Sequence, residues 1–204
     1  MDERAWDQKL HIRTGGWDAS HADAYRYPYE PTAYAVLERL AGSGYVTPDS
    51  VLVDYGCGKG RVGFFLNHTV GCRTVGVEYD EAIYGLAMEN LASYGRPGVE
   101  FVCARAETYE IGSADCFYFF NPFSLELLQS VMGRILESYY CKLKRLRLFF
   151  YYPSDAYVSW LMTRGELVFL EELDCRDLFP GSQSRERILI FELPELKGEL
   201  YHGL

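Results

Sequence analysis

The chain has 204 residues, of which 49% are hydrophobic and 24% charged, and its formal net charge at pH 7 is −9. This length and composition predict one globular domain with a substantial core and exclude a disordered or fibrous chain. The negative charge argues against binding to bulk nucleic acid, and no apolar run is long enough to cross a membrane.

The start Met1-Asp2-Glu3 is acidic and does not resemble a signal peptide, so a cytoplasmic protein is expected. The six cysteines include no C-x-x-C pair. Four of them stand in or beside apolar segments and are expected to be buried, reduced thiols: Cys57, Cys72, Cys103 and Cys116. The sequence therefore predicts neither a metal site nor a disulfide framework.

Residues 1–31 have no clear hydrophobic period but contain several large aromatic side chains: Trp6, Trp17, Tyr25, Tyr27 and Tyr29. Two interpretations remain open, an irregular arm that packs its aromatics onto the domain and a lid that keeps water from a ligand. Thr32 is then expected to cap a helix that ends at Gly42 and Gly44. Its apolar stripe comprises Ala33, Val36, Leu37, Leu40 and Ala41.

The stretch 51–66 combines a strand, a glycine turn and the start of a helix. Residues 51–54 are too uniformly apolar to alternate, so they predict a strand that is covered on both faces. Gly56, Gly58 and Gly60 allow positive φ angles and a close approach of a ligand to the backbone. The following helix offers unpaired N–H groups, so the stretch predicts a cradle for an anion or nucleotide.

The spacing of these glycines argues against two common cradles. The dinucleotide fingerprint G-x-G-x-x-G would need a third glycine where Arg61 stands. A phosphate-binding loop would need four residues between its glycines and then Gly-Lys-Ser/Thr, which the chain lacks. The pattern that remains is Asp54-x-Gly56-x-Gly58-x-Gly60.

Residues 74–78 predict a second strand that ends in Glu78, which stands 24 residues after Asp54. In a βαβ unit this spacing places a carboxylate at the carboxyl end of the neighbouring strand, where it can accept hydrogen bonds from both hydroxyls of a ribose. The alternative is a solvated acid at a strand end. The glycine turn before it favours the ribose role.

Two further strands are expected, at residues 99–103 and 116–120. A helix precedes the first of them, stops at Gly95 and has as its stripe Ile83, Leu86, Ala87, Asn90 and Leu91. The second is followed by Asn121-Pro122-Phe123, and Ser124 is expected to cap the next helix. Asn121 should lie at the carboxyl edge of a parallel sheet, where ligands bind, although a purely geometric strand-end turn would use the same residues.

The C-terminal part predicts a strand over 148–152, a short helix that begins at Ser154 or Asp155, and strands over 167–170 and 186–191. The last two strands have no crossover helix between them, so an antiparallel strand is expected. The base-rich segment 142–147 is interpreted as a solvated lead into a strand rather than a phosphate site.

Together, the first motif, Glu78 and the strand–helix alternation resemble the class I S-adenosylmethionine-dependent methyltransferases over roughly residues 32–193. The chain is similar to small bacterial-type members with Gly-Cys-Gly-Lys-Gly-Arg as first motif and Phe-Asn-Pro-Phe as fourth. The resemblance implies an α/β, three-layer Rossmann-like methyltransferase fold, whose mostly parallel seven-stranded sheet has one antiparallel strand near the C-terminus. Residues 1–31 would form the arm or lid and 194–204 a tail.

The same resemblance implies S-adenosyl-L-methionine as methyl donor and S-adenosyl-L-homocysteine as product. It assigns cofactor contacts to Asp54, Tyr55, Gly56, Cys57, Gly58, Gly60, Glu78, Tyr79, Ala106, Glu107 and Asn121. Arg105 departs from the family pattern, because an Asp usually stands there and contacts adenine; Glu107 is a candidate to take over that role.

Asn121-Pro122-Phe123 resembles, with one proline missing, the Asn-Pro-Pro-Tyr/Phe motif of methyltransferases that act on amino or amide nitrogens. The resemblance implies catalytic roles for all three residues. The Asn121 and Pro122 carbonyl groups would accept hydrogen bonds from the nitrogen, and Phe123 would stack on the acceptor.

Two other functions remain open, a non-catalytic module that binds S-adenosylmethionine and a nucleotide-linked oxidoreductase, which the absence of the third fingerprint glycine disfavours. The acceptor is expected to be a small molecule or a protein rather than bulk nucleic acid. Its identity, the methylated atom and the oligomeric state are not encoded in these motifs.

Overall fold

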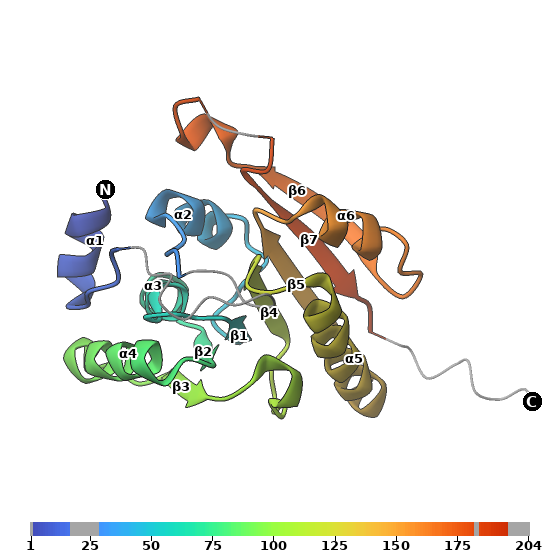
Figure 1. The fold of residues 1–204 in the computed structure, drawn as a ribbon, viewed down its shortest axis with the longest axis horizontal. Coiled ribbons are helices and arrows are strands. Elements are labelled where there is room, and N and C mark those ends of the chain that lie inside the picture. The colour runs from blue at the N-terminus through green and yellow to red at the C-terminus, as the bar shows by residue number, and fades with distance from the viewer. Residues whose placement is uncertain (1, 17–28, 182–183, 196–204) are drawn as a thin grey trace, which may run out of the picture.

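The computed structural model describes residues 2–16, 29–181 and 184–195. Its centre is one seven-stranded sheet with the spatial order β3-β2-β1-β4-β5-β7-β6 (Figure 1). The strands are β1 (Val51–Tyr55), β2 (Arg73–Glu78), β3 (Val99–Cys103), β4 (Cys116–Phe120), β5 (Leu146–Tyr151), β6 (Val168–Asp174) and β7 (Arg187–Leu193). Only β7 runs antiparallel to its neighbours, β5 and β6. The expected mostly parallel sheet with one antiparallel strand near the C-terminus is confirmed.

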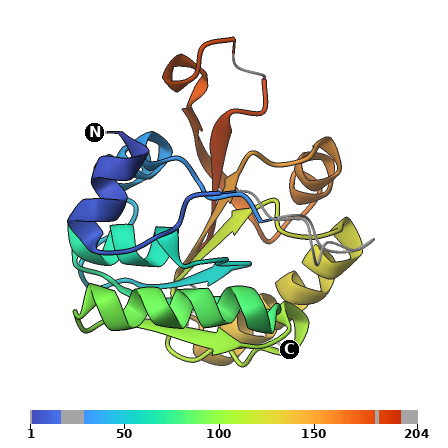
Figure 2. The ribbon, with the colours of Figure 1, turned by 60° about the vertical axis from the view of Figure 1, so that its left-hand side comes forward.

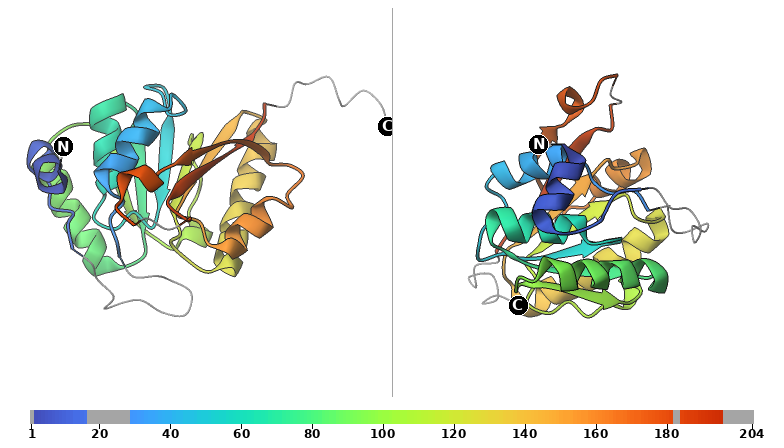
Figure 3. Two further views of the ribbon diagram at one scale, coloured as in Figure 1. Left: turned by 90° about the horizontal axis from the view of Figure 1, so that it is seen from above. Right: turned by 90° about the vertical axis from the view of Figure 1, so that its left-hand side faces the viewer.

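Helices cover both faces of this sheet, which gives three layers (Figures 1 and 2). One face packs against α1 (Glu3–Leu10), α2 (Tyr34–Gly42), α3 (Arg61–Val70) and α4 (Glu81–Tyr94). The other packs against α5 (Leu125–Lys142) and α6 (Asp155–Leu161). The left panel of Figure 3, viewed from above, shows the sheet between these two sets of helices. Because both faces of the central strands are covered, β1 and β4 consist of nearly continuous apolar residues, whereas the edge strand β6 is largely exposed.

The helix boundaries follow local capping chemistry. The Ser124 hydroxyl accepts a hydrogen bond from the Leu127 N–H at the start of α5, and Ser154 caps α6 through Tyr157 in the same way. Gly95 ends α4 in the left-handed conformation, with φ 64°. The expected caps at Ser124 and Gly95 are therefore confirmed, and of the two candidates Ser154 and Asp155 it is Ser154 that caps α6.

Several local expectations are wrong. Residues 3–10, expected to be irregular, form α1, because the Asp2 carboxylate caps the Ala5 N–H and two residues of the helix, Trp6 and Leu10, enter the core. Thr32 does not cap α2, because the Thr32 hydroxyl shares a hydrogen bond with the Tyr118 hydroxyl. The helix begins after Ala33 and has no side-chain cap.

Two side chains are more exposed than expected. Leu86, expected on the buried stripe of α4, is 40% exposed, because the core side of that helix is carried by Ala87, Asn90 and Tyr94. Cys103 is exposed as the last residue of β3, whereas Cys57, Cys72 and Cys116 are buried free thiols as expected. Within the described residues, no helix combines the length and hydrophobicity needed to cross a membrane.

Candidate functional site

The glycine loop, residues 56–60, connects β1 to α3 and has a backbone that only glycine adopts at low cost. Gly56, Gly58 and Gly60 have φ angles of 74°, 56° and 89°. The Gly56 and Cys57 N–H groups both donate to the Val77 carbonyl, at 2.9 and 3.2 Å. The loop therefore curls back onto β2, and three glycines are needed because three of its residues lie in the left-handed region.

Protein side chains fill the space beside these glycines. A Cβ at residue 56 would lie 2.8 Å from Pro122, and a Cβ at residue 58 would overlap the ring of Tyr29. A Cβ at residue 60 would overlap Phe101. The sequence predicted that these glycines admit a ligand to the backbone. In this structure they admit neighbouring side chains, and Pro122 is thereby placed directly against the loop.

Glu78 holds the glycine loop from the end of β2. Its Oε2 accepts a hydrogen bond from the Gly58 N–H at 2.9 Å, and its Oε1 accepts one from the Asp80 N–H at 3.0 Å. Burial raises the pKa of the Glu78 carboxyl, and these N–H donors oppose the rise. Each carboxylate oxygen has two lone pairs, so both can accept a further hydrogen bond from a ligand.

Among the described residues, three buried oxygen atoms in or beside the strand ends at the loop have no hydrogen-bond partner: Asp54 Oδ2, Asn121 Oδ1 and, on the opposite face of β1, the Tyr55 hydroxyl. Asp54 belongs to β1, and Asn121 follows β4, which is paired with β1. Burial, and secondarily the charge of Glu78, raises the pKa of Asp54 to about 8. Because nearly all buried polar atoms in proteins are paired, two orphaned acceptors on adjacent strands indicate a ligand site.

Of the residues in the turn after β4, Asn121 has an unpaired oxygen among the described residues, whereas the Phe123 ring is packed in the core. Asn121 has a φ of 40°, rare for a residue other than glycine. Phe123 is 3% exposed, its ring lies edge-on to Phe119 at 6.3 Å, and its carbonyl accepts a hydrogen bond from the Tyr157 hydroxyl. This placement contradicts the expected stacking on an acceptor, because the ring is already packed in the core.

Tyr55 and Cys57, two of the predicted cofactor residues, are buried. The Tyr55 ring stacks on Phe119 at 5.3 Å, on the face of the sheet opposite Asp54, because side chains alternate along a strand. Burial raises the pKa of Tyr55 and also that of the Cys57 thiol. The Tyr55 side chain therefore lies away from Asp54, whereas the Cys57 thiol is on the same side of the sheet as Asp54, and the charges of Glu78 and Asp54 add to the rise of its pKa.

The remaining predicted residues follow β2 and β3. Tyr79 is 43% exposed and lies under the Arg105 guanidinium, 5.6 Å from the ring centre. Arg105 also pairs with Glu107 at 3.5 Å. Ala106 and Glu107 belong to the 3-10 turn η1 (Ala106–Thr108). The structure thus brings Arg105 and Glu107 together, and these residues line the edge of the sheet beyond Glu78.

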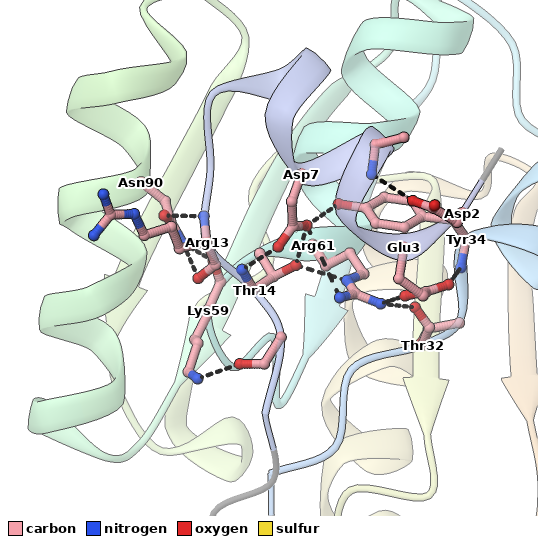
Figure 4. A network of polar contacts seen from close by, with 12 residues as sticks. Asp2, Glu3, Asp7, Arg13, Thr14, Thr32, Tyr34, Lys59, Arg61 and Asn90 are labelled. Atoms are coloured by element: carbon pink, nitrogen blue, oxygen red, sulfur yellow. Dashed lines mark hydrogen bonds and ion pairs between the residues drawn. The ribbon is translucent and has the colours of Figure 1, made fainter.

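A polar network on the outer side of the loop gives no signal in the sequence pattern. Its centre is Arg61, which stands where the dinucleotide fingerprint would have a glycine, is 4% exposed and joins α1 to α3 (Figure 4). Tyr29, expected to be part of a general aromatic arm, packs on Gly58. The other arm aromatics Trp17, Tyr25 and Tyr27 lie outside the described residues, so the choice between arm and lid stays open.

A separate groove of about 950 Å³ lies between α1 and α4. Its lining includes Arg4, His11 and Glu89 and contains none of the predicted site residues. Among the described residues, no three His, Cys, Asp or Glu side chains gather as a metal site would require.

Known proteins resemble both the sequence and the fold. A family model described as a methyltransferase domain matches residues 52–145. An RNA methyltransferase from Salinibacter ruber, solved with S-adenosyl-L-homocysteine, superimposes with a TM-score of 0.57 at 23% identity, over 83% of this chain and 97% of that one. The chain has the Rossmann-like methyltransferase fold.

The curated relatives are much longer proteins. The H3 lysine-79-specific histone-lysine N-methyltransferase of Dictyostelium discoideum is 37% identical over 71 residues, or 35% of this chain. The zinc finger CCCH domain-containing protein 24 of Arabidopsis thaliana is 28% identical over 110 residues, or 50% of this chain. The chain spans only 4% and 14% of their lengths, respectively.

Proposed function

We propose that this chain is an S-adenosylmethionine-dependent methyltransferase that transfers the methyl group to a nitrogen atom. One observation carries the proposal: Asp54 Oδ2 and Asn121 Oδ1 are buried without partners, among the described residues, beside the glycine loop of a methyltransferase fold. A fold alone hosts many functions, so the argument rests on these atoms and their chemistry.

The residues present fit the cofactor. Glu78 can accept the ribose hydroxyls with the lone pairs that the Gly58 and Asp80 N–H groups leave unused. The buried Asp54 oxygen is an acceptor for an N–H donor, and the turn that holds Ala106 and Glu107 is the predicted adenine side. When bound, the cofactor supplies an activated methyl group, so the protein need only align the acceptor and exclude water.

Asn121 and Pro122 would provide this alignment. The Asn121 Oδ1, unpaired within the described residues, can accept a hydrogen bond from an amine or amide N–H, which orients the nitrogen lone pair. Pro122 sets the distance between Asn121 and the glycine loop, because its ring packs against the position that a Cβ of residue 56 would occupy. Phe123 supports this turn from the core instead of contacting the acceptor.

For the acceptor we propose a small molecule or a protein amine. The net charge of −9 disfavours bulk nucleic acid. The basic segment near residue 144 is also engaged internally: Lys142 donates to the Ile111 carbonyl at 3.3 Å and Lys144 to the Ser113 carbonyl at 2.6 Å. The Dictyostelium relative is named for a lysine acceptor, and several structural neighbours are named for RNA, so both classes belong in the test.

Calorimetric titration with S-adenosylmethionine, S-adenosylhomocysteine and, as control, NADH tests the cofactor assignment. We expect micromolar binding of the first two, lost in Glu78→Ala and retained in Glu100→Ala, whose carboxylate is exposed on β3. Absence of binding by the wild type would refute the proposal, and binding of NADH alone would point to an oxidoreductase.

Transfer of a labelled methyl group to amine, protein and RNA acceptors then distinguishes an enzyme from a binding module. Asn121→Ala should abolish turnover while leaving cofactor affinity within about twofold, because the orphaned oxygen faces the acceptor in this proposal. Equal losses of turnover and affinity would show that Asn121 acts on the structure of the loop instead.

A further inference from the structure

Arg61 is a buried cation directly beside the glycine loop. It is the first residue of α3, immediately after Gly60, and only 4% of it is exposed. Its Nε donates to the Thr14 hydroxyl at 2.7 Å and its Nη1 to the Thr32 carbonyl at 3.1 Å. Nη1 also pairs with the Glu3 carboxylate (Figure 4). The guanidinium therefore connects α3 to two separate stretches of the N-terminal chain.

The partners of Arg61 are themselves tied to one another. Asp7 accepts hydrogen bonds from the Thr14 N–H at 2.8 Å, the Thr14 hydroxyl at 2.7 Å and the Tyr34 hydroxyl at 2.6 Å. Glu3 accepts another from the Tyr34 N–H at 2.9 Å. Figure 4 shows these groups converging on Arg61. Two carboxylates balance one buried cation, as burial of a charge requires.

A second set of contacts ties the same N-terminal stretch to the loop itself. Lys59, inside the loop, donates to the Gly15 carbonyl at 2.9 Å. Asn90 of α4 donates to the Lys59 carbonyl at 3.0 Å and exchanges hydrogen bonds with the backbone of Arg13. Residues 13–16 therefore run along the outer side of the glycine loop.

The loop is thus held from two sides. On one side the Glu78 carboxylate accepts the Gly58 N–H. On the other the Tyr29 ring packs on Gly58, and its hydroxyl donates to the Thr14 carbonyl at 2.5 Å. A loop with three left-handed glycines has many alternative conformations, so external contacts must select the one observed.

We propose that Arg61 is a positioning residue for the glycine loop: it holds the N-terminal segment 2–16 against the loop and so fixes the backbone that receives the cofactor. The inference rests on the proposed function for its cofactor, but its structural part concerns only residues of this chain. If the released loop occupies its binding-competent conformation only about 1–10% of the time, the apparent Kd rises about 10- to 100-fold, so Arg61 influences binding without touching the ligand.

Arg147 is a matched control. Its side chain is 20% exposed, its Nη1 donates to the Tyr45 carbonyl at 2.6 Å, and its guanidinium lies 5.4 Å from the Tyr45 ring centre and 3.5 Å from Glu192. Arg61 likewise combines a carbonyl, a carboxylate and a tyrosine ring, Tyr34 at 4.4 Å. Arg147 is at the amino-terminal end of β5, the opposite edge of the sheet from the loop.

The experiment compares full-length Arg61→Met and Arg147→Met. Two quantities are measured well below the melting temperatures, the Kd for S-adenosylmethionine and the hydrogen-exchange rate of the Gly58 amide without ligand. For Arg61→Met we expect a roughly 10- to 100-fold higher Kd and roughly tenfold faster Gly58 exchange. Arg147→Met should stay within about twofold of wild type in both, even if it loses as much thermal stability.

Unchanged Gly58 exchange in Arg61→Met, or equal effects of the two variants, would overturn the inference. If Arg61→Met does not fold, Arg61→Lys decides, because it keeps the charge but not the fork that reaches Thr14 and Thr32 together. Failure of the wild type to bind S-adenosylmethionine refutes the proposed function, whereas the exchange measurement tests the anchoring of the loop separately.

Discussion

At the carboxyl edge of the sheet, the turn after β1 forms one half and the turns after β4 and β5 form the other. Both halves contain left-handed backbone conformations, but in different residue types. After β1, the chain turns through left-handed conformations at three glycines, which adopt them without steric cost. After β4 and β5, the chain turns through left-handed conformations at Asn121 and Tyr152, with φ angles of 40° and 49°. Such conformations cost about 1–2 kcal/mol in most residues other than glycine, and less in asparagine.

This difference shows which parts of the edge are encoded locally. The glycine loop has its shape because of its own residues, so its conformation follows from the sequence. The turn at Tyr152 is imposed by its neighbours: its N–H donates to the Arg187 carbonyl at 3.0 Å, and Arg185 donates to its carbonyl at 3.3 Å. The strained half is the one proposed to meet the acceptor, in agreement with the tendency of backbone strain to occur at functional sites.

Gly58→Ala should disrupt the glycine loop and cause the largest loss of stability among these variants. The new Cβ would overlap the Tyr29 ring at a φ of 56°, so overpacking and backbone strain add up to about 2–5 kcal/mol of lost unfolding free energy. Urea denaturation measures the loss, and calorimetry should show no cofactor binding. Gly112→Ala is the control, because nothing lies within 4 Å of its Cβ position. Equal stability of the two variants would contradict this account.

The pH dependence of stability tests the buried carboxylate between the two halves. Burial raises the pKa of Asp54 to about 8 in the folded state, from about 4 when unfolded. The folded state therefore binds the extra proton between these values, and stability falls as the pH rises through that window, by at most about 1.4 kcal/mol per pH unit. Below about pH 4 and above about pH 8 this group adds no further slope.

Asp54→Asn removes this titration. Between pH 6 and pH 8 the wild type should lose about 2 kcal/mol more than the variant, measured by urea denaturation at each pH. Asp115 provides the control, because its carboxylate accepts the Val51 N–H at the other end of β1. Asp115→Asn should retain the wild-type slope. A slope unchanged by Asp54→Asn would show that Asp54 is ionised throughout this range.

Much of the fold could be predicted because it is encoded in local patterns. Apolar runs of about five residues predicted the strands β1 and β4, and Ser124 marked the start of α5. The helix α1 was missed because only two of its side chains, Trp6 and Leu10, are buried, which is too few for a visible period. Besides the Asp2 cap and these two side chains, α1 is held by Arg61, far along the chain, which pairs with Glu3.

The candidate site was predictable only in part. The positions of Glu78 and the glycines follow from their spacing, and the structure does bring Glu78 to Gly58. Tyr29 on Gly58 and Thr14 at Arg61 are pairs distant in sequence, and no local pattern encodes them. Phe123 was misjudged because the sequence alone does not reveal on which side of a strand-end turn a ring lies.

Asn121→Gly tests whether the strained turn after β4 has a function, and it should cause the smallest change in stability among these variants. Glycine relieves the left-handed strain at φ 40° and removes a buried oxygen that has no partner among the described residues, and together these gains outweigh the added flexibility of the unfolded chain. We expect the unfolding free energy to rise by about 1 kcal/mol, in urea denaturation, while methyl transfer is lost.

Leu143→Gly provides the matched control for this trade-off. Leu143 has a φ of 53° at the end of α5, so glycine should also stabilise it by about 1 kcal/mol, but methyl transfer should be unchanged. If Asn121→Gly instead destabilised the protein by more than about 1 kcal/mol, Asn121 would be a structural residue. The strained turn after β4 would then be a consequence of packing, and the distinction between the two halves of the edge would lose its functional meaning.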